Sequence, residues 1–150
     1  NQYLADLHHS PERFEPHSRE RLLAGAMIPS AWYLQAQRFR RHARQAMKSL
    51  FSQADVLIAP ATPCSATPIG AEEMVINGQP LPVRASMGML TQPISFLGLP
   101  VVTVPLRTAS GKPIGLQLIA APFNEQACLR AARALEAMGI TDARVAESAA

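Results

Sequence analysis

The stretch GLPVVTVPLRTASGKPIGLQLIAAP, residues 98–122, decides the fold of this chain. It contains two apolar segments, PVVTVPL and PIGLQLIAAP, joined by a polar turn at Ser110-Gly111. Because both segments are apolar on both faces, we expect two buried strands of a sheet that helices cover on both sides. No side chain in the stretch is suited to attack a bond, bind a metal or cradle a phosphate. The stretch therefore predicts scaffold and leaves the chemistry to other residues.

The segments that precede this stretch predict a further strand and a hairpin. DVLIAP, residues 55–60, has the length and the Val/Ile content of a buried strand. In EMVINGQPL the pair Asn77-Gly78 is a strong hairpin signal, and Pro80 makes the hairpin peripheral. We expect RASMGMLTQP to form a short helix that ends near Pro93.

Helices are predicted on either side of these strands. Asn124 is a candidate cap for the last helix, whose inner stripe would be Cys128, Ala131, Leu135 and Met138 and which Gly139 would end. A long helix is predicted from about Ser30 to Ser52. Its apolar stripe is Trp32, Ala36, Phe39, Ala43, Ala46, Met47 and Leu50.

The segment before the long helix is more irregular. Ser18 is a candidate cap for a short helix that Gly25 weakens and Pro29 ends. Residues 1–17 are polar and contain two prolines, so we expect a loop or the tail of an earlier element. The order of elements predicts an α/β fold around a largely buried sheet.

The composition is that of one globular domain. The 150 residues are 48% hydrophobic and 17% charged, which excludes a disordered chain. The net charge of +3 is too small to indicate nucleic-acid binding without a clustered basic face. Four basic residues lie off the apolar stripe of the long helix: Arg38, Arg41, Arg44 and Lys48. Because no aromatic residues interleave with them, a solvated face is favoured over a nucleic-acid interface.

The cysteines and the hydropathy pattern bear on location. Cys64 and Cys128 are far apart and form no metal-type pair, which is typical of a reduced cytosolic chain. We find no signal peptide and no apolar run near the roughly 20 residues that span a bilayer. We therefore expect a cytoplasmic protein without membrane contact.

Catalytic and metal-binding patterns are missing. There is no glycine-rich phosphate loop, no His/Cys metal spacing and no pair of acids near a predicted cleft. The adjacent pair His8-His9 would point in opposite directions, so solvated histidines are favoured over a metal site. The two lysines, Lys48 and Lys112, neighbour no serine- and glycine-rich catalytic turn. We expect no metal and no cofactor.

Several linked motifs nevertheless resemble the C-terminal part of the amidase signature family. They are Gly98-Leu99-Pro100, Val104-Pro105, the PIGLQ segment of residues 113–117, and Pro122-Phe123-Asn124-Glu125. The segment RERLLAGAMIPSAWYLQAQ is similar to the helix pair of the family. The resemblance runs from about Arg19 to Glu136, and we assign residues 18–150 to the matching region. It implies a fragment of the amidase signature fold, a mixed sheet flanked by helices on both faces.

The resemblance also implies an activity and the place of its catalytic residues. Family members hydrolyse carboxamides through an acyl-enzyme, using a Ser–cis-Ser–Lys triad. The lysine and the Gly-Ser-Ser-type stretch lie upstream of the motifs seen here, and this sequence contains no Gly-Ser-Ser run. By resemblance, no catalytic residue lies in this chain.

The residues that the resemblance leaves to this chain would bind substrate. Arg21, just before the apolar pair of its helix, is the candidate for a bidentate grip on a substrate carboxylate. The alternative is a surface ion pair with Glu20 or another nearby acid. Tyr33 is a candidate pocket residue or, alternatively, a core tyrosine. Three further residues complete the set: Thr62 in the loop up to Ser65, and Thr91 and Gln92 before Pro93. For Arg84, an exposed surface arginine is favoured over a second positive charge in the pocket.

One departure bears on the substrate. Transamidating subunits of the family carry an acidic residue where this sequence has Gly88, and there it meets the amino group of the substrate. The resemblance therefore favours a small anionic amide without that amine. The sequences PATPCSATPIG and residues 83–108 most resemble those of biuret- and carboxybiuret-type amidohydrolases of nitrogen catabolism.

Two other hypotheses remain open, a non-catalytic binding or assembly module and the A-type subunit of a tRNA-dependent amidotransferase. The expected partners are the N-terminal part of the same enzyme, a small amide substrate, further copies of the chain and a small accessory subunit. Strand edges and apolar surface that the N-terminal part would cover predict self-association of the isolated chain. A monomer at high concentration in sedimentation would contradict this expectation.

Overall fold

The computed structural model describes residues 2–141. The chain divides into two compact units, Asn1–His42 and Ala43–Ala150. The long helix α3 (Ser30–Phe51) belongs to both, because the division falls between His42 and Ala43. Among residues 2–141, no helix combines the length and the apolar character needed to cross a membrane.

The first unit is helical, and residues 2–17 include helical turns, so of the two expectations for this segment the loop is not seen. It contains α1 (Leu4–His9), a 3-10 turn η1 (Pro11–Arg13), α2 (Pro16–Ala26) and the start of α3. Leu7 is buried, and the rings of Tyr3 and Phe14 meet edge to face with centroids 6.2 Å apart. These contacts give the short α1 a small apolar cluster of its own.

The N-terminal cap of α2 is Glu15, so the prediction of Ser18 as the cap is wrong. The Glu15 carboxylate accepts hydrogen bonds from the backbone N–H of His17 at 3.3 Å and of Ser18 at 2.8 Å. Pro16, the next residue, starts the helix without losing a hydrogen bond, because the first N–H groups of a helix have no partner within it. Ser18 instead lies in the first turn.

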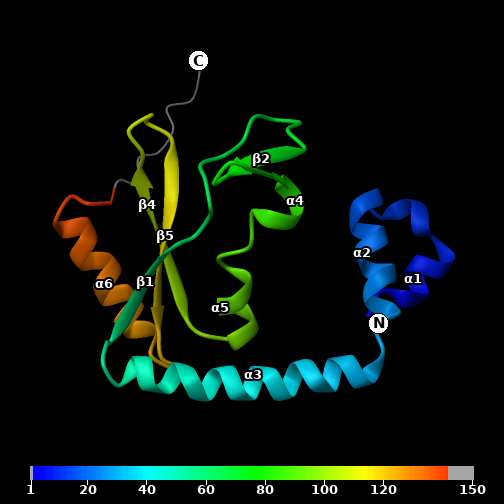
Figure 1. Ribbon diagram of the computed structural model, residues 1–150, viewed down its shortest axis with the longest axis horizontal. Helices are drawn as coiled ribbons and strands as arrows, with labels where there is room; N and C mark the ends of the chain where they lie inside the picture. The colour runs from blue at the N-terminus through cyan, green and yellow to red at the C-terminus, as the bar shows by residue number, and fades with distance from the viewer. Residues whose placement is uncertain (1, 142–150) are drawn as a thin grey trace. The chain divides into compact units, whose positions relative to one another are not determined.

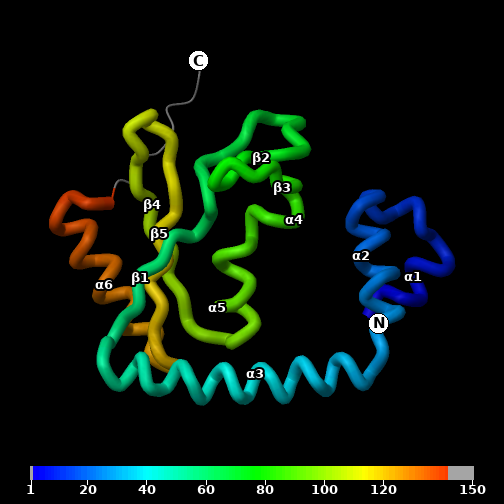
Figure 2. The backbone as a smooth tube through the Cα atoms, in the orientation of Figure 1, coloured from blue at the N-terminus to red at the C-terminus, as the bar shows by residue number. Residues whose placement is uncertain are grey.

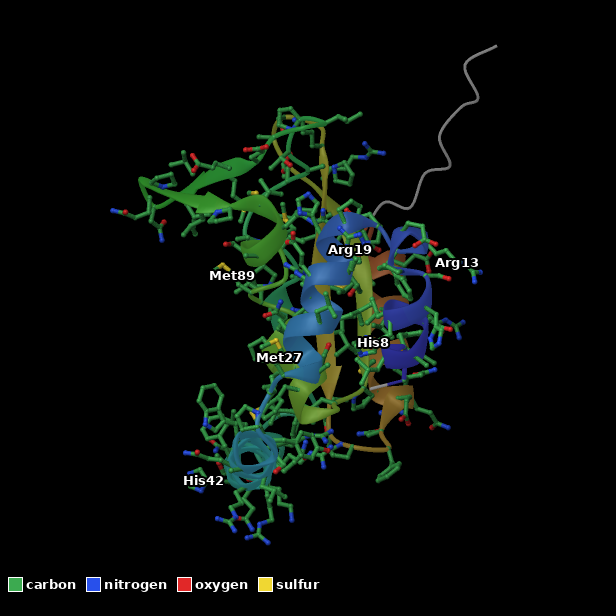
Figure 3. The ribbon with its side chains drawn as sticks, turned by 90° about the vertical axis from the view of Figure 1, so that its right-hand side faces the viewer. His8, Arg13, Arg19, Met27, His42 and Met89 are labelled. Carbon is green, nitrogen blue, oxygen red and sulfur yellow. The ribbon has the colours of Figure 1, made fainter. Side chains whose placement is uncertain are left out.

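The apolar stripe of α3 forms but is not buried within the described residues. Trp32 is 68% exposed, Phe39 62% and Leu50 45%, and no residue of this helix is buried. Met27, the residue after α2 that is labelled in Figure 3, is 81% exposed. Apolar surface on this scale is typical of a face that packs against another part of a protein or against a partner.

The second unit is built on a three-stranded sheet. Its strands are β1 (Val56–Pro60), β4 (Val101–Arg107) and β5 (Pro113–Ala120), in the order β1-β5-β4. Both pairings are antiparallel, and Gln117 of β5 lies between Ala59 and Thr103. All three predicted strands are confirmed. Within residues 2–141 this sheet is antiparallel throughout, and the parallel pairing of a mixed sheet is not seen there.

Both faces of β5 are covered. Leu118 and Ala120 lie on one face, where Ala120 packs with Ala127 and Cys128 of α6 (Glu125–Ala137). Gln117 and Ile119 lie on the opposite face and are both 2% exposed. Figure 1 shows α6 on one side of the strands and α5 (Gln92–Leu97) on the other. The predicted α/β class with helices on both faces is confirmed.

A separate hairpin precedes these helices. It consists of β2 (Glu73–Ile76) and β3 (Gln79–Pro82), and the tube in Figure 2 shows its turn away from the main sheet. Asn77 and Gly78 have φ of 51° and 77°, the left-handed pair that a two-residue type I′ turn requires. The sequence prediction of this hairpin is confirmed.

One predicted helix boundary and one predicted helix face differ from the structure. The helix expected to end near Pro93 is instead a short helix α4 (Val83–Ser86) followed by α5, which begins at Gln92. Pro93 lies in the first turn of α5, where its missing N–H costs no hydrogen bond. In α6, Cys128 is fully buried but Met138 is 71% exposed, so the predicted inner stripe stops short of Met138. Gly139 ends this helix at a φ of 69°, as predicted.

Gly115 allows the chain after β1 to lie directly on the sheet. A Cβ at this position would lie 2.8 Å from the Thr103 methyl group and 2.9 Å from the Ala61 Cβ. The backbone N–H of Ala61 donates to the Gly115 carbonyl at 2.8 Å. Because the Ala61 Cβ cannot rotate away, a side chain at residue 115 must push the two segments apart.

We predict that Gly115→Ala lowers the free energy of unfolding by about 1–3 kcal/mol, the usual cost of overpacking. Gly25→Ala is the matched control, because a Cβ there meets no atom within 4 Å and Gly25 lies inside α2. That control should raise stability by about 0.5–1 kcal/mol. Thermal unfolding measures both changes, and an equal or higher Tm for Gly115→Ala would contradict the close approach.

Candidate functional site

A pocket of about 620 Å³ opens on the Gln117 face of the sheet. Thr103, Pro105 and Gly115 lie on that face and form its floor. The remaining lining residues come from the loop after β1, from the end of α4 and from the start of β5: Thr62, Cys64, Ala66, Thr67, Met87, Pro113 and Ile114.

The loop after β1 forms the first wall of the pocket. The Thr62 hydroxyl donates to the Cys64 carbonyl at 2.8 Å, which closes a local turn. The Cys64 thiol donates to the Met74 sulfur at 3.6 Å and so joins the loop to β2. Together with the bond from Ala61 to Gly115, these contacts hold the loop beside the sheet.

The turn of residues 87–92 forms a second wall, where Met87 lines the pocket. The Gly88 carbonyl accepts from the backbone N–H of Thr91 at 3.1 Å, from that of Gln92 at 2.9 Å and from the Thr91 hydroxyl at 3.1 Å. The Gln92 side chain lies over Gly88, since a Cβ there would be 3.2 Å from the Gln92 Nε2. This wall is a compact turn with its side-chain hydroxyl used internally.

Gln117 joins the two walls, and the sequence analysis missed this role. Its Nε2 donates to the Pro60 carbonyl at 2.9 Å and to the Leu90 carbonyl at 3.3 Å. A sequence signal was present, because Gln117 is the one polar residue between Ile114 and Pro122. Polar groups buried in a strand are almost always hydrogen bonded, but sequence alone cannot name their partners.

The predicted site residues fall into the two units. Thr62 lines the pocket, whereas Thr91 and Gln92 lie in the turn behind Met87 and not in the lining. Arg21 and Tyr33 belong to the first unit, and Thr62, Thr91 and Gln92 belong to the second. Tyr33 is 60% exposed, and its alternative as a core residue is not seen within residues 2–141.

Arg21 is exposed on α2. Within the described part of the chain it forms no hydrogen bond or ion pair, so the alternative of a pair with Glu20 is not realised there. Its guanidinium is therefore available to an anionic ligand.

The basic face predicted on α3 is partly structural. The Arg44 Nε donates to the Leu97 carbonyl at 2.6 Å, where α5 ends. A cation at the carbonyl end of a helix offsets unsatisfied acceptors there. Arg44 is exposed, as expected for the solvated face, and its Nε in addition holds the end of α5.

The pocket lining contains hydroxyls, a thiol and apolar groups but no carboxylate, imidazole or amine. It therefore offers hydrogen bonds and shape to a small ligand but no general base. No group of three or more His, Cys, Asp and Glu residues within residues 2–141 is arranged to bind a metal ion.

Comparison with known proteins gives consistent matches. A family model described as Amidase matches residues 4–129. The AtzE subunit of the 1-carboxybiuret hydrolase from Pseudomonas sp. strain ADP is 52% identical over 140 residues. The A-type subunit of the glutamyl-tRNA(Gln) amidotransferase from Roseiflexus sp. strain RS-1 is 38% identical over 122 residues.

Two solved structures are similar to most of the chain. A chain of a structure described as an unexpected vestigial protein complex, which reveals the evolutionary origins of an s-triazine catabolic enzyme, has a TM-score of 0.90 and 50% identity, over 96% of this chain and 32% of that one. The crystal structure of an amidase has a TM-score of 0.85 and 32% identity, over 91% of this chain and 31% of that one.

The chain spans only part of the relatives that it matches. The match to the carboxybiuret hydrolase protein covers 92% of this chain but 31% of that protein. The match to the amidotransferase protein covers 78% of this chain and 24% of that protein.

We predict that the two cysteines differ in reactivity with a water-soluble thiol reagent. Cys64 lines the open pocket, whereas Cys128 is fully buried against the sheet. Cys64 should react faster on the order of 100-fold, because Cys128 must await a local opening of the fold. Peptide mapping by mass spectrometry gives both rates, and denaturant should make them equal. Similar rates in the native protein would contradict the described packing of α6.

Proposed function

Because the chain belongs to the amidase family, we propose that it is part of an enzyme that hydrolyses a carbon–nitrogen bond of a small amide. The family match over residues 4–129 carries this proposal, and the 52% identity to a carboxybiuret hydrolase protein supports it. Since the chain spans about a third of that relative, we assign it one portion of the enzyme.

In this proposal the chemistry is divided between two portions of the enzyme. A serine activated by a second serine and a lysine attacks the amide carbonyl, the amine leaves, and water hydrolyses the acyl-enzyme. The chain has no Gly-Ser-Ser run, and the pocket lining holds no base, so the triad is supplied from outside these residues. The chain contributes the sheet, the Thr62 pocket wall and the binding residue Arg21.

The substrate that we propose is a small anionic amide of the biuret type. An exposed guanidinium such as that of Arg21 binds a planar carboxylate with two parallel hydrogen bonds. Gly88 supports a substrate without an amino group, because the Gln92 amide already fills the space where an acidic side chain would begin. Thr62, Thr91, Gln92 and Tyr33 complete the proposed substrate-binding set.

A transamidating function is the second candidate, and the 38% identity to the A-type amidotransferase protein favours it. Such an enzyme would act on a tRNA-linked substrate, whereas the first candidate needs no nucleic acid. Binding of tRNA by the full gene product would support this reading, and Gly88 argues against it.

We also propose which surfaces meet partners. The exposed stripe of α3 and the exposed Ile58 of the edge strand β1 are the surfaces that the remaining portion of the enzyme would cover. Assembly into a homo-oligomer, a cytoplasmic location in nitrogen metabolism and a small accessory subunit belong to the same proposal.

The direct test is ammonia release by the full gene product from a carboxylated biuret and from neutral amides. We expect hydrolysis of the anionic substrate to be favoured. If no amide yields ammonia, the proposed function is wrong.

We predict that Arg21→Ala in the full gene product raises KM for the anionic amide by about 10- to 100-fold, the usual worth of charge-assisted hydrogen bonds. Its effect on a neutral amide should be small. Arg38→Ala, another exposed arginine of the same unit, is the control and should leave KM unchanged. Steady-state kinetics decide the question, and an unaltered KM in Arg21→Ala would remove Arg21 from the site.

A further inference from the structure

Gln117 is a buried polar side chain in an otherwise apolar strand. It is 2% exposed, and its neighbours Leu118 and Ile119 are 0% and 2% exposed. A buried amide stabilises a structure only when its hydrogen bonds are satisfied, and replacing it leaves its partners unsatisfied. The two carbonyls that accept hydrogen bonds from Gln117 are 30 residues apart in the chain, at Pro60 and Leu90.

Each of these carbonyls belongs to one wall of the pocket. Pro60 ends β1 two residues before Thr62, whose turn with Cys64 forms the first wall. Leu90 lies inside the compact turn that presents Met87 at the second wall. One side-chain nitrogen therefore holds both walls to the central strand.

We propose that Gln117 is a positioning residue, whose amide sets the separation of the Thr62 and Met87 walls and thereby the fit of the substrate. The proposal rests on the proposed function, since it assigns the pocket to the amide substrate. Gln117 does not line the pocket and acts only through the two backbone segments.

The test uses Gln117→Met in the full gene product, because methionine keeps the length of the side chain and removes the donor. Gln53→Met is the matched control. The Gln53 Nε2 also donates to a backbone carbonyl, that of Ser49 at 3.0 Å, but on an exposed helix end. Gln117→Glu is a second variant, in which a carboxylate faces two carbonyl oxygens and should have the larger effect.

Two readouts separate positioning from general stability. Cys64 lines the pocket, so wider walls should raise its labelling rate about tenfold. Cys128, buried between α6 and the sheet, should keep its rate. KM for the anionic amide should rise about tenfold with kcat within about twofold, since the groups that make and break bonds are elsewhere. The control should change neither quantity.

Other outcomes overturn the proposal. Unchanged Cys64 labelling and unchanged KM in Gln117→Met would show that the amide positions nothing. Faster labelling of both cysteines in Gln117→Met would show that this variant has lost the fold. The test is then repeated with Gln117→Asn, whose side chain keeps the amide but is too short to reach both carbonyls. If that variant also exposes Cys128, Gln117 supports the fold as a whole and the proposal is wrong. Absence of hydrolysis by the wild type refutes the proposed function alone, because thiol labelling still decides the role of Gln117.

Discussion

The central place of β5 between β1 and β4 is the constraint on which the second unit depends. Its last four residues, Gln117 to Ala120, are at most 2% exposed, and both neighbouring strands take their register from it. On one face β5 packs against α6, and on the other face it contacts the two pocket walls. Gly115 and Gln117 are neighbouring positions on that second face. Gly115 leaves room for the first wall, and the Gln117 side chain donates hydrogen bonds to both walls.

This arrangement suits a portion of an enzyme that shapes a binding site without performing the chemistry. The pocket offers hydroxyls and apolar surface, and the exposed cation Arg21 belongs to the other unit. Such a portion controls substrate fit through KM, whereas the bond-breaking groups control kcat. The exposed stripe of α3 fits the same reading, because a catalytic portion would bury it.

Sequence patterns predicted the elements wherever local signals and packing agree. Strands β4 and β5, the Asn77-Gly78 turn and the Gly139 helix end were all predicted, since each follows from hydropathy or backbone preference. The errors arose where several residues compete for one role, as at Ser18, where Glu15 provides the cap, or at Pro93, which starts a helix turn instead of ending one. The part played by Gln117 was beyond sequence reasoning, because both of its partners are backbone atoms distant in the chain.

The central claim is that this chain binds and shapes while another portion of the same enzyme carries the nucleophile. It is tested most directly by treating the full gene product with a fluorophosphonate, which labels activated serines, and mapping the modified peptide by mass spectrometry. The account predicts loss of amidase activity with the label on a serine outside these 150 residues. A label on a serine within them, such as Ser65 beside the pocket, would contradict it.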